Sequence, residues 1–353
     1  MKCKVLLTAC ALILCMQAVW GQAKVEKAVY YDPNQTQGWM GVDARELIHD
    51  YFVSQGYTDL DSEGVKKWME DRIRDRVPSV IVMSQDIYPS TIVEVQDGQI
   101  ADITTLRRYL DAGGKVVHLA DWPIYYVSVD GVNITPAGGG ATKVLGFGAS
   151  DINDTNEEVV ITDAGKAWGL TQTWTSQRAL DAAKADVVLA SIQGGAGAAG
   201  WVRRFALLPG SGYVRLWDTA TNAGNITDEV LADIQRVAEY GLDVVSGMGT
   251  VKGVVVDQNG KPVAGATVKL MASFGSATVL TNDAGEFSAV AAAGNVKASA
   301  VGKLITSSET VDAVVKTGET TNITIKVSAV EPYVYHIVKA KTPIVIDENI
   351  TDQ

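Results

Sequence analysis

The fold of the C-terminal part is decided by the stretch VKGVVVD at 251–257, followed by GKPVAGATVKL at 260–270 and TNDAGEF at 281–287. Apolar residues alternate with other residues in a period of two, which is typical of strands with one buried face. Asn-Gly at 259–260 and Asp-Ala-Gly at 283–285 favour hairpin turns. Short strands separated by turns about every ten residues predict a small antiparallel β-sandwich.

Over residues 250–328, the joint spacing of Gly, Pro, Gly-Ala and Asp-x-Gly resembles the carboxypeptidase regulatory-like domain of transthyretin type. The resemblance implies an all-β transthyretin-like sandwich at 248–328. It also implies a spacer or interaction module of the kind found in secreted and cell-envelope proteins, without catalytic residues of its own.

The N-terminus has the pattern of a secretory signal peptide. Two lysines precede an apolar run at 5–19 that is too short to span a membrane, and small residues follow at Gly21 and Ala23. We therefore expect a leader at 1–23, a secreted, periplasmic or cell-surface protein, and no transmembrane segment in the mature chain. The sequence LTAC at 7–10 leaves a second interpretation open, in which Cys10 is the lipidated residue of a lipoprotein.

Charge and cysteine content narrow the range of functions. The net charge of the chain is −11, and loss of Lys2 and Lys4 with the leader would make it −13 (−11 − 2). Such an acidic chain repels phosphate backbones, so nucleic acid is not an expected partner. All three cysteines lie within 1–23. The mature chain would then have no disulfide and no thiolate, and we expect neither a cofactor nor a metal.

Residues 24–247 show a different pattern, in which strand and helix signals alternate. Expected strands lie at 25–31, 80–83, 115–120, 186–190 and 213–217, and expected helices at 43–55, 102–112 and 227–241. This order predicts the α/β class, with a flavodoxin-like parallel sheet that has helices on both faces. The connection to the sandwich is the glycine-containing segment 246–250.

The phrases SQDIYP at 84–89 and YLDAGGKVVH at 109–118, with the order of elements, resemble the class I glutamine amidotransferase-like superfamily. Enzymes of that group place a nucleophilic cysteine on a glycine-flanked turn between strand and helix. Here the strand runs into LADWP at 119–123, without cysteine or glycine. The resemblance therefore implies a domain without the family's catalytic residue.

Three weaker features carry no site. We interpret His49 as a packing or surface residue of the first helix and His118 as a hydrogen-bonded residue within a buried strand. The two histidines are far apart and have no metal-ligand spacing. The glycine-rich segment 194–200 lacks the Lys-Ser/Thr of a phosphate-binding loop, so we expect a flexible loop there.

Position in the predicted fold gives the better indication of a site. Ligands of open parallel sheets bind beyond the carboxyl ends of the strands. Aromatic rings beside carboxylates and amides suit sugars, because rings cover C–H faces and polar groups bond hydroxyls. The alternative is that polar loops and tryptophans simply cover the rim of the sheet. The candidate ligand-binding residues are Asp32, Asn34, Trp39, Gln85, Asp86, Asp121 and Trp122.

Two classes of function follow from these observations. The first is a secreted or cell-envelope binding or assembly protein without catalytic activity, whose partner is a carbohydrate or another envelope protein. The second is a cysteine-independent hydrolase that acts on glycosides through Asp86 and Asp121. The segment 329–353 is an incomplete β segment that resembles the opening of a family 9-like carbohydrate-binding module. An edge strand that pairs with the sandwich is the alternative interpretation.

Overall fold

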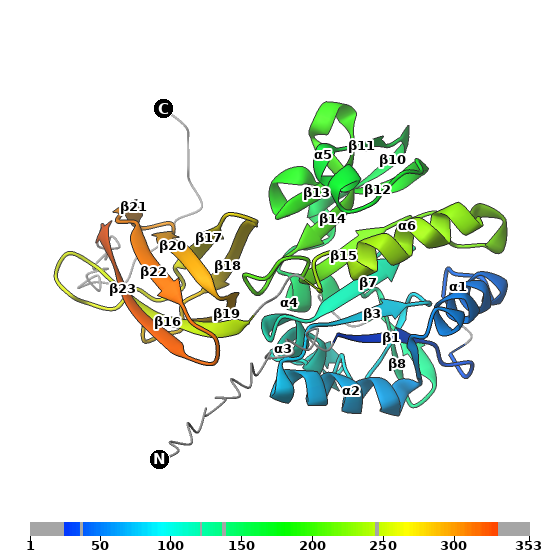
Figure 1. Ribbon diagram of the computed structural model, residues 1–353, viewed down its shortest axis with the longest axis horizontal. Coiled ribbons are helices and arrows are strands. Elements are labelled where there is room, and N and C mark those ends of the chain that lie inside the picture. The colour runs from blue at the N-terminus through cyan, green and yellow to red at the C-terminus, as the bar shows by residue number, and fades with distance from the viewer. Residues whose placement is uncertain (1–24, 36–37, 121, 136–138, 244–246, 331–353) are drawn as a thin grey trace, which may run out of the picture.

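The computed structural model describes residues 25–35, 38–120, 122–135, 139–243 and 247–330. Strands hold 41% of these residues and helices 23%. A larger N-terminal unit extends to helix α6, and a smaller unit made of strands follows it (Figure 1).

The N-terminal unit is built on a ten-stranded sheet with the order β10-β12-β14-β15-β7-β3-β1-β2, in which β13 pairs with β14 and β11 pairs with β13. Its strands are β1 (Glu26–Tyr30), β2 (Thr58–Leu60), β3 (Ser79–Met83), β7 (Lys115–Leu119), β10 (Ile152–Glu158), β11 (Val160–Ile161), β12 (Thr175–Asp181), β13 (Val187–Ile192), β14 (Gly197–Arg203) and β15 (Gly212–Leu216). Two small sheets contain β4 (Ile87–Pro89), β8 (Tyr126–Val129) and β9 (Val132–Ile134), and β5 (Val95–Gln96) and β6 (Gln99–Ile100). The helices are α1 (Val42–Ser54), α2 (Ser62–Asp75), α3 (Thr105–Asp111), α4 (Gly140–Leu145), α5 (Asp163–Ala167) and α6 (Asp228–Glu239).

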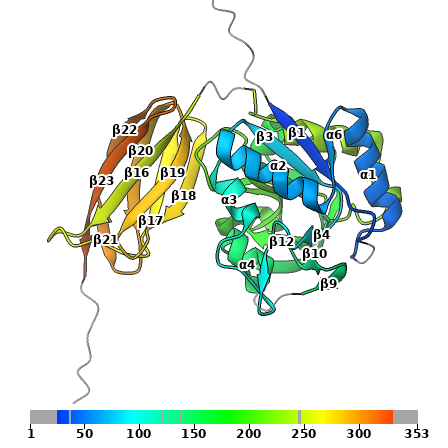
Figure 2. The ribbon, with the colours of Figure 1, turned by 90° about the horizontal axis from the view of Figure 1, so that it is seen from below.

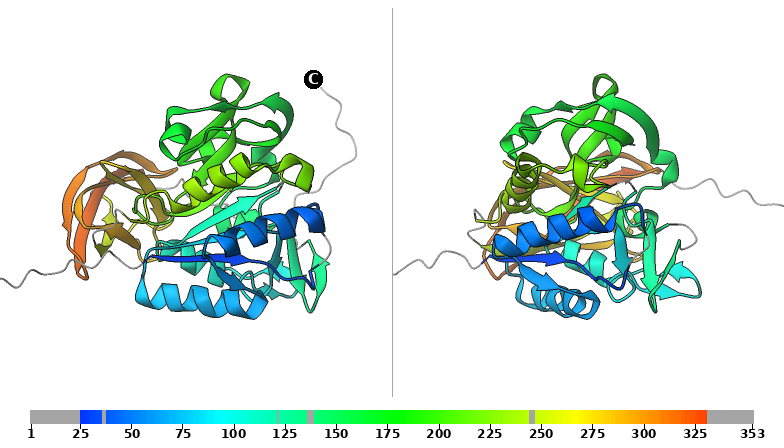
Figure 3. Two further views of the ribbon diagram at one scale, coloured as in Figure 1. Left: turned by 45° about the vertical axis from the view of Figure 1, so that its right-hand side comes forward. Right: turned by 90° about the vertical axis from the view of Figure 1, so that its right-hand side faces the viewer.

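Five strands of this sheet, β2, β1, β3, β7 and β15, run parallel to one another. Strands β3 and β7 are buried along their whole length, which explains their nearly continuous apolar sequences. Helices α1 and α6 pack on one side of these strands through Ile48 and Ile234. Helices α2 and α3 pack on the other side through Met69 and Leu106, as Figure 3 shows from two directions.

The prediction of a flavodoxin-like parallel sheet with helices on both faces is wrong. Residues 152–203 do not continue the alternation of strand and helix but form β10 to β14, which pair antiparallel. The connections at 182–186 and 193–196 are far shorter than the dozen or so residues that a parallel crossover needs. The segment 197–200, expected in a loop, lies in buried strand β14. The sheet is therefore mixed, in a chain with more strand than helix.

Helix α6 is fixed at both ends by side chains. The Thr227 hydroxyl accepts a hydrogen bond from the N–H of Val230 (3.4 Å), which confirms Thr227 as the expected N-cap. At the other end, the fully buried Lys115 of β7 donates through Nζ to the carbonyls of Val237, Ala238 and Tyr240 at 2.7–3.0 Å. A lysine at a helix C-terminus satisfies carbonyls that have no partner within the helix.

The C-terminal unit consists of two four-stranded sheets, β19-β16-β23-β21 and β18-β17-β20-β22, that lie face to face (Figure 2). They share a core that includes Val251, Val268 and Leu270. Strands β16 and β23 pair parallel, so the expected purely antiparallel arrangement needs correction. The strands are β16 (Met248–Val256), β17 (Thr267–Ala272), β18 (Gly275–Leu280), β19 (Glu286–Ala292), β20 (Gly294–Val301), β21 (Ile305–Ser308), β22 (Val311–Val315) and β23 (Thr320–Ala329).

Both expected turns of this unit form, and the first closes an antiparallel bridge between Val256 and Pro262, whereas the second joins β18 and β19, which do not pair. Gly260 has φ +80° in the turn after β16, and the Asn282 side chain accepts bonds from the N–H groups of Ala284 and Glu286. Each turn leads from one sheet to the other. The hairpin expected at the first turn therefore forms over one short bridge, and the hairpin expected at the second turn does not form.

The loop between β14 and β15 joins the two units. The N–H of Leu207 donates to the carbonyl of Val290 (2.8 Å), and the N–H of Ala292 donates to the carbonyl of Leu207 (2.9 Å). The Leu207 side chain is fully buried within the core of the C-terminal unit. In addition, the Arg76 guanidinium donates to the Thr250 hydroxyl (3.0 Å). The N-terminal unit thus contributes one residue to the core of its neighbour.

The expected leader at 1–23 and most of the expected incomplete β segment, 331–353, lie outside the described residues. Both assignments stay predictions. Within the described ranges, no helix is both long and apolar enough to cross a membrane.

Candidate functional site

Most of the candidate residues lie where the parallel strands end. The loop after β1 carries Asp32, Asn34 and Trp39, and the segment after β3 carries Gln85 and Asp86. Trp122 follows β7, and Asp121 lies outside the described residues. Bonds join the first two segments directly, because the Gln85 amide oxygen accepts from the N–H of Asp32 (3.2 Å).

Asp32 holds its own loop in place. Its Oδ1 accepts bonds from the backbone N–H (3.0 Å) and the side-chain amide (3.1 Å) of Asn34. Its Oδ2 accepts a bond from the hydroxyl of Ser62, at the start of α2. The carboxylate is mostly buried, so these partners account for its oxygens and leave a structural role for Asp32 and Asn34.

Asp86 holds the same loop from the β3 side. Its Oδ2 accepts a bond from the N–H of Trp39 (2.8 Å), and its Oδ1 lies 3.8 Å from Nη2 of Arg45. Burial raises the pKa of Asp86 and lowers the pKa of Arg45, although their charges attract each other. A Cβ at Gly38 would lie 2.5 Å from Asp86 Oδ1, so the loop closes over the carboxylate.

Aromatic rings gather beside these anchored carboxylates. The Trp39 ring centroid lies 4.7 Å from that of Tyr125 and 5.2 Å from that of Tyr126. Trp122 joins the group, 6.3 Å from Tyr125. Trp39 is 39% exposed, which is unusual for a tryptophan with ring neighbours. We call these four residues the edge cluster.

Sequence reasoning missed Tyr125 and Tyr126, which contribute half of the edge cluster. The signal was present, because both follow Trp122 within four residues in the same loop after β7. Trp39 and Trp122 were expected near one another, and the structure connects them through Tyr125.

A buried hydrogen-bonded network joins β4, β7 and β15, and β4 pairs with β8, the strand that Tyr126 opens. Nδ1 of His118 lies 3.0 Å from the Tyr88 hydroxyl, which lies 2.8 Å from the Tyr213 hydroxyl. All three side chains are fully buried, and burial lowers the pKa of His118 to about 3. The interpretation of His118 as a hydrogen-bonded residue in a buried strand is confirmed. The expected packing or surface role of His49 also fits, since its ring nitrogens face Asp50 and Asp59 at 2.9 and 3.0 Å.

Ala120 adopts a backbone conformation that residues with a Cβ rarely take. It follows β7 directly, has φ +76°, and donates its N–H to the carbonyl of Trp217 (3.2 Å). This is the turn at which the resemblance to amidotransferases would place a nucleophile. The side chain present is a buried methyl group.

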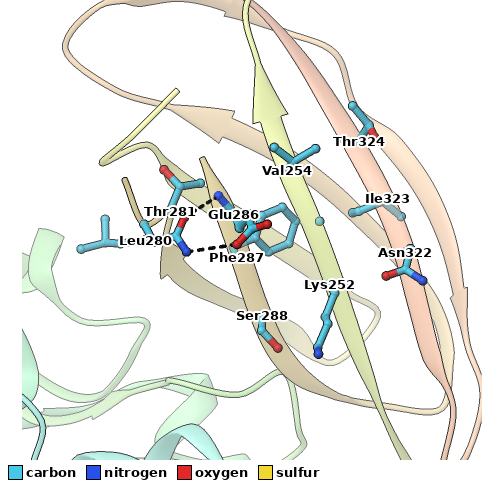
Figure 4. A pocket seen from close by; sticks show the side chains of 12 residues that line it. Lys252, Val254, Leu280, Thr281, Glu286, Phe287, Ser288, Asn322, Ile323 and Thr324 are labelled. Atoms are coloured by element: carbon cyan, nitrogen blue, oxygen red, sulfur yellow. Dashed lines mark hydrogen bonds between the residues drawn. The ribbon is translucent and has the colours of Figure 1, made fainter. Parts of the chain in front are cut away.

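The C-terminal unit contains a pocket of about 700 Å³ that spans β16, β19 and β23 (Figure 4). Lys252, Ser288 and Asn322 line it, and Glu286 is tied to Asn282 by hydrogen bonds. The Phe287 ring, which also lines this pocket, is 5% exposed and offers no open face to a ligand. This pocket therefore has polar groups suited to hydroxyls but lacks the exposed ring that the edge cluster provides.

Among the described residues, no group of three or more His, Cys, Asp or Glu side chains could hold a metal ion.

One comparison with known proteins gives a family. Residues 25–241 match the model of the MJECL34 family, and the chain belongs to that family. No curated protein matches the sequence.

Solved structures show partial likeness to this chain. The TIE protein of Bacillus anthracis is 19% identical at a TM-score of 0.22, over 24% of this chain and 17% of its own. A DUF3823 family protein from Parabacteroides merdae is 18% identical at a TM-score of 0.21, over 24% of this chain and 47% of its own. The 3-chlorocatechol 1,2-dioxygenase of Rhodococcus opacus is 12% identical at a TM-score of 0.19, over 25% of this chain and 62% of its own. The chain thus spans less than two thirds of the length of each.

Proposed function

We propose that this protein is a binding protein of the cell envelope or the secreted fraction, and that its edge cluster holds a carbohydrate. The observation that supports the proposal is the contact of Trp39 with Tyr125 and Tyr126 while Trp39 stays 39% exposed. Rings in this state can cover the C–H faces of a sugar without first moving.

The charged groups near the edge cluster favour binding over hydrolysis. Asp32 Oδ1 and Asp86 Oδ2 accept hydrogen bonds from the loop that carries Trp39, Asp32 Oδ2 accepts one from Ser62, and Asp86 Oδ1 faces Arg45 at 3.8 Å. A glycoside hydrolase needs two carboxyl groups that can reach the scissile bond. Asp86 is 1% exposed and bonded to backbone, so its raised pKa reflects burial rather than readiness to protonate a substrate.

Hydrolysis through Asp86 and Asp121 is the second candidate function. The raised pKa of Asp86 is the observation that favours it, since a general acid needs such a shift. In that case the variant Asp86→Asn would release no reducing sugar from a polysaccharide that the wild type degrades.

The test of the binding proposal is affinity gel electrophoresis of the mature chain in soluble xylan, β-glucan and glucomannan. We expect at least one polysaccharide to retard the wild type, and Trp39→Ala to weaken retardation about 10-fold, which corresponds to about 1.4 kcal/mol of lost stacking. Phe274→Ala is the matched control, because Phe274 is a comparably exposed ring (36%) on the C-terminal unit.

Unchanged migration of the wild type in all three polysaccharides would contradict the proposal. Equal retardation of the wild type and Trp39→Ala would move the binding surface away from the edge cluster.

A further inference from the structure

Two adjoining cavities lie between the N-terminal and C-terminal units. One has a volume of about 420 Å³ and the other about 780 Å³, and Tyr240 and Phe274 line both. The first also contains Trp168, Arg204 and Gly275. We call the two together the cleft. It lies away from the edge cluster and shares no residue with it.

Arg204 is the unusual residue of the cleft. It is 4% exposed, and its Nε is buried without a hydrogen-bond partner. Its guanidinium lies against the backbone of Gly275, since a Cβ there would come within 2.0 Å of Nη1. Burial lowers the pKa of Arg204, because the charged group has lost water. A buried guanidinium usually has a carboxylate or phosphate partner that matches its planar fork.

Asp186 lines the same cavity, yet it does not bind the guanidinium. Its Oδ2 accepts a bond from the backbone N–H of Arg204 (2.8 Å) and another from Nη1 of Arg203 (2.9 Å). Lys269, also in the lining, adds a second positive charge. The smaller cavity therefore combines two cations with one carboxylate that is already engaged. The larger cavity adds Lys27, Glu239 and Asp243, of which Lys27 and Glu239 form an ion pair at 2.9 Å.

The walls beside Arg204 are aromatic. Trp168 and Tyr240 stack with centroids 4.4 Å apart and ring planes at 21°. Phe274 stands at the boundary of the two cavities and is 36% exposed. Apolar walls with a few polar groups aimed inward are the usual composition of a small-molecule site.

We propose that the cleft binds a small organic anion, whose carboxylate or phosphate pairs with the Arg204 guanidinium while its apolar body lies against Phe274 and Tyr240. Lys269 attracts the anion from the rim of the cavity. This inference goes beyond the proposed carbohydrate binding and does not depend on it.

The test is isothermal titration of the mature chain with benzoate, phenyl phosphate and inorganic phosphate. We expect benzoate or phenyl phosphate to bind, and the stronger of the two identifies the anion as carboxylate or phosphate. Arg204→Met should lower the affinity at least 10-fold, and Arg204→Lys should recover part of it, because lysine keeps the charge but loses the fork.

Because the Arg204 variants could fail to fold, Lys269→Gln tests the same cavity without disturbing the core, since Lys269 is exposed. It should weaken binding about 3-fold, as expected for a rim charge. Lys326→Gln removes the same charge from β23 and should leave binding unchanged. Equal affinity in the wild type, Arg204→Met and Lys269→Gln would overturn the proposal, as would no binding of any probe. Inorganic phosphate that binds as tightly as phenyl phosphate would overturn the role of the aromatic walls.

Discussion

The edge cluster and the cleft contain similar residues in opposite states. At the edge, the carboxylates of Asp32 and Asp86 are bonded to their own loop, whereas the Trp39 ring is open to solvent. In the cleft, Trp168 is stacked on Tyr240 and nearly buried, whereas the Arg204 guanidinium lacks a partner for its Nε.

Both places contain buried polar atoms without a hydrogen-bond partner, Asp86 Oδ1 and Arg45 Nε at the edge and Arg204 Nε in the cleft, but they differ in whether the charged group has an opposite charge as its ion-pair partner, and this difference indicates the ligand. At the edge, an exposed aromatic face lies beside buried charges that face each other, since Asp86 Oδ1 and Arg45 Nη2 are 3.8 Å apart, and such a surface suits a neutral ligand with C–H faces, such as a sugar. In the cleft, a buried guanidinium lines the same cavity as two stacked rings, and such a cation suits an anion. The type of residue alone would not separate the two cases, because tryptophan, tyrosine and charged groups occur in both.

The largest expected effect comes from breaking the joint between the units. Leu207→Asp places a charge within the core of the C-terminal unit and should cost at least about 3 kcal/mol of that unit's stability. Because the cleft exists only while the units are docked, binding of benzoate or phenyl phosphate should disappear. Retardation by polysaccharide should persist, since the edge cluster lies wholly in the N-terminal unit.

Two probes measure the uncoupling. No tryptophan occurs after Trp217, so fluorescence reports unfolding of the N-terminal unit, while circular dichroism reports both. In urea, the two signals should change together for the wild type and separate for Leu207→Asp. Leu304→Asp, at a position 41% exposed on the same unit, is the control. Coincident transitions in Leu207→Asp would mean that the loop does not couple the units.

A second prediction concerns His118, which forms a buried hydrogen-bonded network with Tyr88 and Tyr213. Burial lowers the pKa of His118 to about 3 in the folded protein, against 6.5 for a solvated histidine in the unfolded chain. The unfolded chain therefore takes up a proton as the pH falls below 6.5, the folded protein does not, and stability is lost over that range. Between about pH 7.5 and about pH 5 the wild type should lose about 2 kcal/mol more than His118→Gln.

Urea unfolding at the two pH values checks this difference. If His118→Gln lost as much stability at low pH as the wild type, the buried His118 ring would take up a proton in the folded protein. The contrast with the cleft, where a charged group is buried, would then weaken.

The sequence predicted individual elements better than their arrangement. Helix α1 and strands β3 and β7 lie within one or two residues of their expected positions, because each has a clear apolar period. The antiparallel strands at 152–203 were not predicted. Strand β10 has the sequence INDTNEE, with little apolar character, and what places it is pairing with β12 rather than a pattern of its own.

The candidate sites show the same limit. Trp39, Asp86 and Trp122 could be proposed from their place after strands, since that place follows from local sequence. The hydrogen bond from the N–H of Trp39 to Asp86 could not be predicted, because it depends on how the loop folds back. The cleft was invisible to sequence, since Arg204 and Gly275 belong to different units and meet only after those units dock.

The smallest expected effect tests how firmly the edge cluster is supported. Strands β8 and β9 form a hairpin in which Val129 pairs with Val132 across a two-residue turn of Asp130 (φ +50°) and Gly131 (φ +79°). This is the turn that Asp-Gly favours. Tyr126 opens β8, so a strained turn should loosen the cluster from below.

Asp130→Val should cost about 1 kcal/mol, because a β-branched residue resists positive φ, and should weaken polysaccharide retardation about 2-fold. Asp130→Asn tolerates the same φ and should match the wild type in thermal unfolding and in retardation. An equal loss in both variants would assign the effect to the carboxylate instead of the backbone, and unchanged retardation in Asp130→Val would show that Trp39, Trp122 and Tyr125 hold their positions without the hairpin.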